Sequence, residues 1–220
     1  MNKKLYFSYG EKEIAHLKAK DPLLGNIIDS IGEVNRPIIP DLFEALINSI
    51  LGQQISTKAA DTVWERFLTF FSPVSPIHIS SFSAEELQTC GITLRKAGYI
   101  KEISTRIANG TFDLQELKML PDEEVCTRLC KLPGIGIWTA EMLMLHSMQR
   151  QNILSFGDLA IVRGLRMLYH HREITPKLFA KYKRRYSPHA SVASIYLWAI
   201  SAGAVNVLKD PASSKTKRKK

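Results

Sequence analysis

The stretch from Leu129 to Asp158 constrains this chain more than any other. It contains the run Leu132-Pro133-Gly134-Ile135-Gly136, then an apolar segment, and it ends on one acidic residue, Asp158. Pro133 cannot continue the preceding helix, while the two glycines permit a tight turn. A helix that starts directly after such a turn exposes backbone N–H groups, which attract phosphate. The run therefore predicts a helix–hairpin–helix element.

The rest of the chain predicts an all-α globular fold. Hydrophobic residues make up 45% of the sequence and recur at helical spacing, whereas the alternation typical of strands is nearly absent. No apolar run approaches the length of a membrane span, and the N-terminus is too weakly apolar for a secretion signal. Three cysteines, Cys90, Cys126 and Cys130, give no disulfide framework, so we expect a reducing, cytoplasmic setting.

The formal net charge of +9 is unevenly distributed. Five positive charges lie near the end of the chain, at Lys215, Lys217, Arg218, Lys219 and Lys220. We expect residues 1–209 to form a single domain and residues 210–220 a basic disordered tail. A second cluster, Lys181, Lys183, Arg184 and Arg185, is interpreted as a solvated helix face. Basicity alone indicates a polyanionic partner only weakly.

Capping residues and apolar periodicity predict most helix boundaries. Asp41 and Ser83 are good N-caps, and Glu86 completes a capping box with Ser83. After an irregular start or short strand over residues 1–10, the expected helices cover residues 11–31 (in two pieces, broken near Asp21-Pro22), 41–51, 56–71, 83–91, 93–109, 113–119, 121–130, 137–148, 158–170, 176–186 and 190–207.

Three ordered segments resemble the helix-hairpin-helix (HhH-GPD) DNA glycosylases, and most closely the 3-methyladenine DNA glycosylase II type. They are the hairpin run with Trp138-Thr139-Ala140 and the later Phe156-Gly157-Asp158-Leu159, the segment Ile50–Ser56, and the segment Ser191–Trp198. The resemblance covers roughly residues 35–205. It implies two helical lobes, discontinuous in sequence, with the active site in the cleft between them and with hairpin and catalytic aspartate inside residues 129–160.

The resemblance implies a monofunctional glycosylase of base-excision repair. Such an enzyme flips an alkylated purine, such as 3-methyladenine or 7-methylguanine, out of the duplex and hydrolyses its N-glycosidic bond. Asp158 would be the catalytic anion, because a carboxylate near C1′ stabilises an oxocarbenium-like sugar or orients water. From the residues alone the N-cap is the favoured interpretation of Asp158, and the two roles are compatible.

The resemblance also assigns residues to the pocket for the flipped base. Trp138 stands where strand-nicking relatives carry a lysine, so we expect no AP lyase activity. Its indole would stack on a cationic purine, with Met142 one turn further along. His189 and Gln54 complete the expected substrate-binding set. Core packing is the alternative for Trp138 and Met142, and a surface position the alternative for His189. Trp198 is expected in the core.

DNA contacts are expected from two turns. The first turn, between the predicted helices 41–51 and 56–71, contributes Gln53 and Ser56. The second turn is the hairpin, which contributes Gly134, Ile135, Gly136 and Thr139. One side chain of the first turn would fill the gap left by the flipped base. The alternative there is helix capping by Ser56 and a backbone hydrogen bond from Gln53.

The remaining expectations concern cofactors, partners and competing functions. No cofactor is expected, apart from a possible Na⁺ or K⁺ on the carbonyl groups of Cys130, Leu132 and Ile135. The expected partner is double-stranded DNA with a damaged base, bound by a monomer in the bacterial cytoplasm or the eukaryotic nucleus, with no membrane involved. A non-catalytic DNA-binding module and a glycosylase for uracil or hypoxanthine stay open as alternatives.

Overall fold

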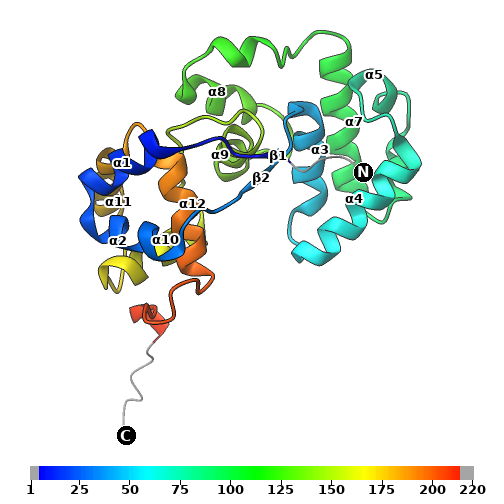
Figure 1. The fold of residues 1–220 in the computed structure, drawn as a ribbon. Helices are drawn as coiled ribbons and strands as arrows, with labels where there is room; N and C mark the ends of the chain where they lie inside the picture. The colour runs from blue at the N-terminus through cyan, green and yellow to red at the C-terminus, as the bar shows by residue number, and fades with distance from the viewer. Residues whose placement is uncertain (1–4, 214–220) are drawn as a thin grey trace, which may run out of the picture. The chain divides into compact units, whose positions relative to one another are not determined.

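The computed structural model describes residues 5–213, and this part of the chain is almost entirely helical (Figure 1). The predicted all-α class is confirmed. None of its helices is both long enough and apolar enough to cross a membrane. In chain order the elements are β1 (Leu5–Tyr6), α1 (Glu11–Lys20), α2 (Pro22–Ile31), β2 (Pro37–Ile38), α3 (Leu42–Gly52), α4 (Thr57–Phe71), α5 (Pro76–Ile79), α6 (Ala84–Gln88), α7 (Leu94–Ala108), η1 (Glu116–Met119), α8 (Asp122–Leu129), α9 (Ile137–His146), α10 (Leu159–Tyr169), α11 (Pro176–Tyr186), α12 (Ala190–Ser201) and η2 (Pro211–Ser213).

The chain divides into two compact units. Unit 1 combines the residues up to Ile38 with those from Gln149 onward, and unit 2 is the continuous segment Ile39–Met148. The hairpin, between α8 and α9, belongs to unit 2, whereas Asp158 belongs to unit 1.

Unit 1 is built around α12, which is buried along most of its length. Helix α10 packs closely against it, and α1 and α11 also contact it. The approach is close because Gly164 of α10 faces the backbone of Leu197, so that a Cβ at position 164 would clash with the Leu197 carbonyl oxygen. The strands β1 and β2 form a short antiparallel pair, with Leu5 opposite Ile38.

A buried polar cluster joins three helices of unit 1. Asp21, only 2% exposed, caps α2 through the N–H of Leu24. Its other oxygen accepts hydrogen bonds from Tyr169 of α10 and, at 2.6 Å, from Arg185 of α11. Burial raises the pKa of Tyr169, which keeps this phenol protonated and able to donate. Arg185 therefore points inward, and its expected place on a solvated helix face is wrong.

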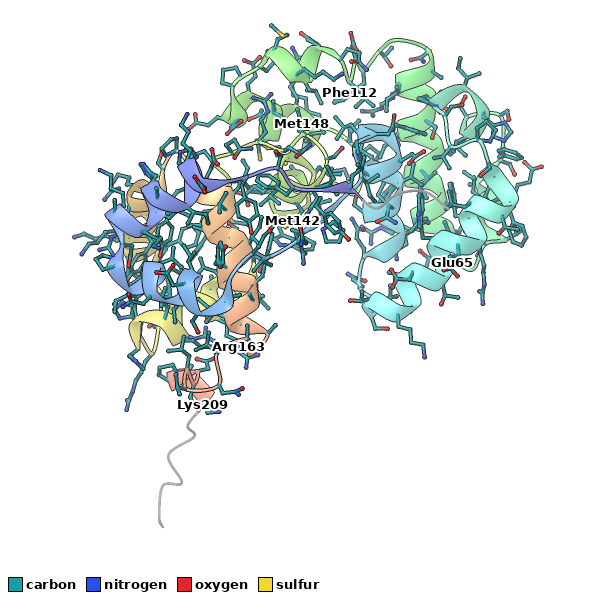
Figure 2. All side chains as sticks on the ribbon, in the orientation of Figure 1. Glu65, Phe112, Met142, Met148, Arg163 and Lys209 are labelled. Carbon is teal, nitrogen blue, oxygen red and sulfur yellow. The ribbon has the colours of Figure 1, made fainter. Side chains whose placement is uncertain are left out.

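Unit 2 is organised around α3, which buries Phe43, Leu46, Ile47 and Ile50. Helices α4, α7 and α9 all contact α3, and α8 packs on α9. Figure 2 shows the side chains that fill the spaces between these helices.

Most predicted helix starts are confirmed by hydrogen bonds that the expected capping side chains accept. Asp41 accepts the N–H of Glu44 at 2.8 Å, and Ser56 accepts that of Ala59. Ser83 and Glu86 form the predicted capping box. Each of these capping bonds joins residues three positions apart, so the helix starts can be predicted from the local sequence.

Three expectations about elements are wrong, and one short helix has no counterpart among the predicted elements. The segment 113–119 is helical only over the 3₁₀ turn Glu116–Met119, and the short helix α5 was not expected. Helix α12 ends at Ser201 instead of residue 207, because Gly203 adopts a left-handed conformation that closes the helix. The expected tail begins too early, since Asp210 forms an ion pair with Arg166 and residues 211–213 form η2. The rest of that tail lies outside the described residues.

The substitution Gly164→Ala tests the close packing of α10 on α12. The added methyl group would meet the Leu197 carbonyl oxygen, and we expect it to lower the free energy of unfolding by about 3 kcal/mol. Gly98→Ala is the matched control, because no atom lies within 4 Å of a Cβ built on this residue of α7. Alanine there should stabilise by about 0.5 to 1 kcal/mol. Urea unfolding measures both, and equal stability of the two variants would contradict the packing account.

Candidate functional site

The carboxylate of Asp158 is held by three N–H donors that converge on one oxygen. Oδ1 accepts the backbone N–H groups of Ala160 and Ile161, each at 2.9 Å, as the N-cap of α10. It also accepts the indole N–H of Trp198 at 3.2 Å. Asp158 is 7% exposed, so the carboxylate is fixed in a largely water-excluded position at the positive end of a helix. Both interpretations of Asp158, as cap and as fixed anion, are compatible with this geometry.

Trp198 and Arg36 are site residues that sequence reasoning missed. Trp198 was expected in the core, but it is only partly buried and donates to Asp158. The guanidinium of Arg36 lies over its ring, 4.6 Å from the centroid. Burial lowers the pKa of Arg36, and the negative charge of Asp158 partly opposes that shift. Asp158, Trp198 and Arg36 come from three distant parts of the sequence, so no local signal connects them.

This arrangement is suited to stabilising positive charge. A carboxylate whose orientation is fixed before reaction needs no reorganisation when a cation forms beside it. Leu159, which follows it, is 84% exposed, although leucine side chains are usually buried. The first residue of α10 is therefore at the surface, and the largely buried carboxylate of Asp158 precedes it in the chain.

The hairpin has the predicted form. Gly134 adopts φ +77°, and the N–H of Ile135 returns to the carbonyl of Leu132 at 3.2 Å. Gly136 is the N-cap of α9 and provides no side-chain cap, so the first N–H groups of α9 are not capped by a side chain. Gly136 is exposed, which leaves that helix end accessible to an anion.

Gly134 is required by its contact with Tyr99 of α7 as well as by its backbone angle. A Cβ at position 134 would lie 2.5 Å from Cδ2 of Tyr99. The carbonyl of Gly134 accepts a hydrogen bond from the side-chain amide of Gln53 at 2.8 Å. The structure thus brings together two predicted DNA-contact residues, Gln53 and Gly134, and joins the end of α3 to the hairpin.

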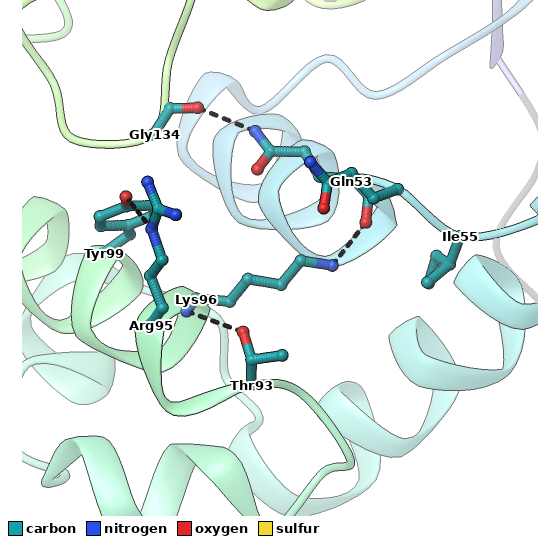
Figure 3. A pocket seen from close by; sticks show the side chains of 8 residues that line it. Gln53, Ile55, Thr93, Arg95, Lys96, Tyr99 and Gly134 are labelled. Carbon is teal, nitrogen blue, oxygen red and sulfur yellow. Dashed lines mark hydrogen bonds between the residues drawn. The ribbon is translucent and has the colours of Figure 1, made fainter.

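The side chain of Lys96, on α7, holds the C-terminal end of α3 in place, and we call this contact the brace (Figure 3). Its ammonium group donates to the carbonyl oxygens of Leu51 and Gln53, at 2.8 and 2.7 Å. Burial lowers the pKa of Lys96. These are the carbonyl groups that a helix leaves unpaired at its C-terminus, so Lys96 acts as a capping group supplied by another helix.

Beyond this brace the α3–α4 bend is exposed. Gln54 adopts a left-handed backbone conformation, with φ 59°, and its side chain is exposed. Ile55 is 42% exposed. A pocket of about 330 Å³ lies between the bend and α7, and its lining includes Gln54, Ile55, Thr93, Arg95, Lys96 and Tyr99. We call it the bend pocket. Ser56 serves as the N-cap of α4, which was the alternative to DNA contact.

The remaining predicted residues have different surroundings. On α9, Trp138 is 47% exposed, Met142 is partly buried and Thr139 is 6% exposed. Ile135, in the hairpin before α9, is 5% exposed. With those two side chains buried, the DNA contact predicted for Thr139 falls to its backbone N–H in the first turn of α9. The N–H of Ile135 is already bonded to the carbonyl of Leu132, so the contact predicted for Ile135 stays a prediction.

His189 packs inside unit 1 instead of beside Asp158. Its ring meets that of His16 edge to face, with centroids 5.0 Å apart. It is the N-cap of α12, and the helical rise separates it from Trp198 by about 13 Å. Burial lowers the pKa of His189, the charge of His16 lowers it further, and Glu13 opposes both. The structure gives His189 a packing contact away from the carboxylate.

The described residues hold no cluster of three or more His, Cys, Asp or Glu side chains that could bind a metal ion. The monovalent cation expected at Cys130, Leu132 and Ile135 stays a prediction. The Leu132 carbonyl accepts one hydrogen bond, from Ile135, and a carbonyl oxygen has a second lone pair for an ion.

Comparisons with known proteins agree on one family. The model of the HhH-GPD superfamily of base excision DNA repair proteins matches residues 47–188. DNA-3-methyladenine glycosylase 1 of Schizosaccharomyces pombe is 31% identical over 164 residues, 72% of this chain and 72% of that protein. The crystal structure of a DNA-3-methyladenine glycosidase from Bacillus halodurans has a TM-score of 0.79 at 34% identity and covers 91% of this chain and 94% of that one. The S. pombe 3-methyladenine DNA glycosylase in complex with abasic DNA has a TM-score of 0.77 at 27% identity, with coverages of 90% and 100%.

The substitution Lys96→Met tests the brace. It removes two hydrogen bonds to the end of α3 and keeps most of the side-chain volume, so we expect a loss of about 2 kcal/mol in unfolding free energy. Faster amide hydrogen exchange over residues 52–56 should accompany it. Lys58→Met, an exposed lysine in the first turn of α4, is the control and should change stability by less than about 0.5 kcal/mol. Unchanged exchange in the Lys96 variant would refute the brace.

Proposed function

This chain belongs to the HhH-GPD superfamily of base excision DNA repair proteins, and on that premise we propose that it is a DNA glycosylase that releases alkylated purines from double-stranded DNA. The observation that carries the proposal is the fixed carboxylate of Asp158 at the start of α10. The hairpin with its open α9 terminus supplies the second requirement, a hold on the DNA backbone.

The proposed reaction is hydrolysis of the C1′–N bond. As the bond breaks, its electron pair leaves with the purine, and the sugar becomes an oxocarbenium-like cation. An N3- or N7-alkylated purine is already positively charged, so it departs neutral and needs little acid catalysis. Asp158 stabilises the sugar cation, and a water molecule adds its oxygen to C1′ and releases a proton. The three donors on Oδ1 keep the carboxylate oriented throughout.

Base and backbone contacts in this proposal come from the surfaces described above. The half-exposed indole of Trp138 offers an electron-rich face to a cationic base, with Met142 one turn along α9. Gln54, exposed and with a left-handed backbone conformation, would fill the gap that base flipping leaves. The N–H groups around Gly134 and Gly136 bind phosphate.

The proposal also covers the setting in which the protein acts. It binds damaged duplex DNA as a monomer, wherever the genome is held: the bacterial cytoplasm or the eukaryotic nucleus. Support for DNA as the partner comes from the structural relative solved with abasic DNA.

Asp158→Asn tests the catalytic role. Asparagine keeps the capping oxygen but removes the charge, so release of 3-methyladenine and 7-methylguanine should fall by about 100-fold or more. Binding to an abasic-analogue duplex should stay equal or become tighter, because repulsion of phosphate is reduced. Asp41→Asn, which alters the N-cap of α3, is the matched control and should retain activity.

Base release is followed by chromatography of the freed bases from alkylated, uracil-containing and hypoxanthine-containing duplexes. Wild-type release by Asp158→Asn would remove the assigned role. Release of only uracil or hypoxanthine would replace the substrate class, and wild-type protein that binds but releases nothing would support a non-catalytic module.

The absence of lyase activity is a separate expectation. The indole of Trp138 has no amine that could form a Schiff base with the sugar. DNA strands should therefore stay intact after base release and break only on alkali treatment, and borohydride should trap no covalent protein–DNA adduct. Strand breaks before alkali, or a trapped adduct, would contradict this part of the proposal.

A further inference from the structure

The bend pocket is a cavity of unit 2 that the proposed chemistry does not use. It lies between the exposed bend after α3 and the first turn of α7 (Figure 3), whereas Asp158 belongs to the other unit. Its volume of about 330 Å³ lies at the lower end of the range for pockets that bind small molecules. Its lining includes Gln54 and Ile55, which are both exposed.

The lining of the bend pocket is positively charged. Arg95 and Lys96 both contribute, and none of its residues is acidic. Two of the three N–H donors of Lys96 are engaged by carbonyl groups, and burial lowers its pKa, so its positive charge lacks a compensating anion. A negative ligand would supply that compensation.

Arg95 is held in a fixed position for a ligand. Its Nε donates to the hydroxyl of Tyr99 at 2.5 Å, and the guanidinium carbon lies 5.5 Å from the centre of the same ring. Within residues 5–213 no carboxylate forms an ion pair with Arg95. Its two terminal nitrogen atoms therefore keep N–H donors for a bidentate contact.

We propose that the bend pocket binds a phosphodiester group of the DNA backbone, held by the guanidinium of Arg95 and the charge of Lys96. The forked donors of arginine match two phosphate oxygens. Ile55 and Tyr99 line the same pocket, and the flanking sugars would pack on these two side chains. The inference rests on the proposed function, because it takes DNA as the partner.

A phosphate in this pocket would fix the bend as well as add affinity. The pocket is bounded by the bend on one side and by α7 on the other, and Tyr99 also contacts Gly134 of the hairpin. One bound phosphate would therefore set the register of Gln54 on the duplex, while the hairpin holds another point of the backbone.

Arg95→Gln is the test, and Arg106→Gln is its matched control. Arg106 lies on the same helix, outside the pocket, and pairs with Glu102. Dissociation constants for a duplex with a tetrahydrofuran abasic site are measured over a series of salt concentrations. Arg95→Gln should weaken binding about 10-fold and reduce the salt slope by about 0.9, the value for one lost phosphate contact, with all four opposite bases alike. Arg106→Gln should leave both quantities near wild type. Tyr99→Phe should give a smaller loss, because it frees Nε of Arg95.

Two results would overturn the inference. An unchanged salt slope in Arg95→Gln, with thermal unfolding like wild type, would show that no phosphate is bound there. A loss confined to one opposite base would show contact with a base edge. Base release by the wild-type protein is measured separately. A wild-type protein that releases no base, together with a reduced salt slope in Arg95→Gln, would refute the proposed function and leave the phosphate site supported.

Discussion

The hydrogen bonds to Oδ1 of Asp158 are the interaction that links the start of α10 to α12 and holds the proposed catalytic carboxylate in place. The same oxygen starts α10, engages the indole of Trp198 and fixes the carboxylate. Since those donors belong to α10 and α12, the position of the negative charge depends on how the two helices pack, and Gly164 allows their close approach. Folding and the proposed chemistry therefore use one set of bonds, and stability at this point is inseparable from the placement of the carboxylate.

Unit 2 solves a comparable problem with a brace. The end of α3 is held by Lys96 and, through Gln53, by the Gly134 carbonyl. These polar atoms are used internally, so the neighbouring Gln54 can keep an exposed, left-handed conformation without loosening the helix. In both units the groups proposed to meet DNA sit where a helix begins or ends, because there backbone donors and acceptors lack partners within the helix.

Local signals in the sequence predict most of this fold, and long-range contacts explain what they miss. Asp41, Ser83 and the Pro-Gly run fix helix ends through bonds within a few residues, so those boundaries are confirmed. Trp198 and Arg36 join Asp158 only through tertiary packing, and a helix buried on all sides gives no periodicity that separates core from site. The ring contact of His189 with His16 and the hydrogen bond of Arg185 to Asp21 likewise join residues that lie far apart in sequence.

The chain passes from unit 1 into unit 2 after Ile38 and returns to unit 1 at Gln149, so unit 2 is inserted in the sequence of unit 1. The N–H of Ile39 donates to the carbonyl of His146 at 3.0 Å, so the first residue of unit 2 is tied to a residue close to its end at Met148. A segment whose ends meet is topologically an insertion, and it can leave or enter a host chain without threading. The hairpin, the Lys96 brace and the bend pocket all belong to the continuous segment of unit 2 and would be removed or inserted together. The carboxylate of Asp158 belongs to unit 1 and would remain.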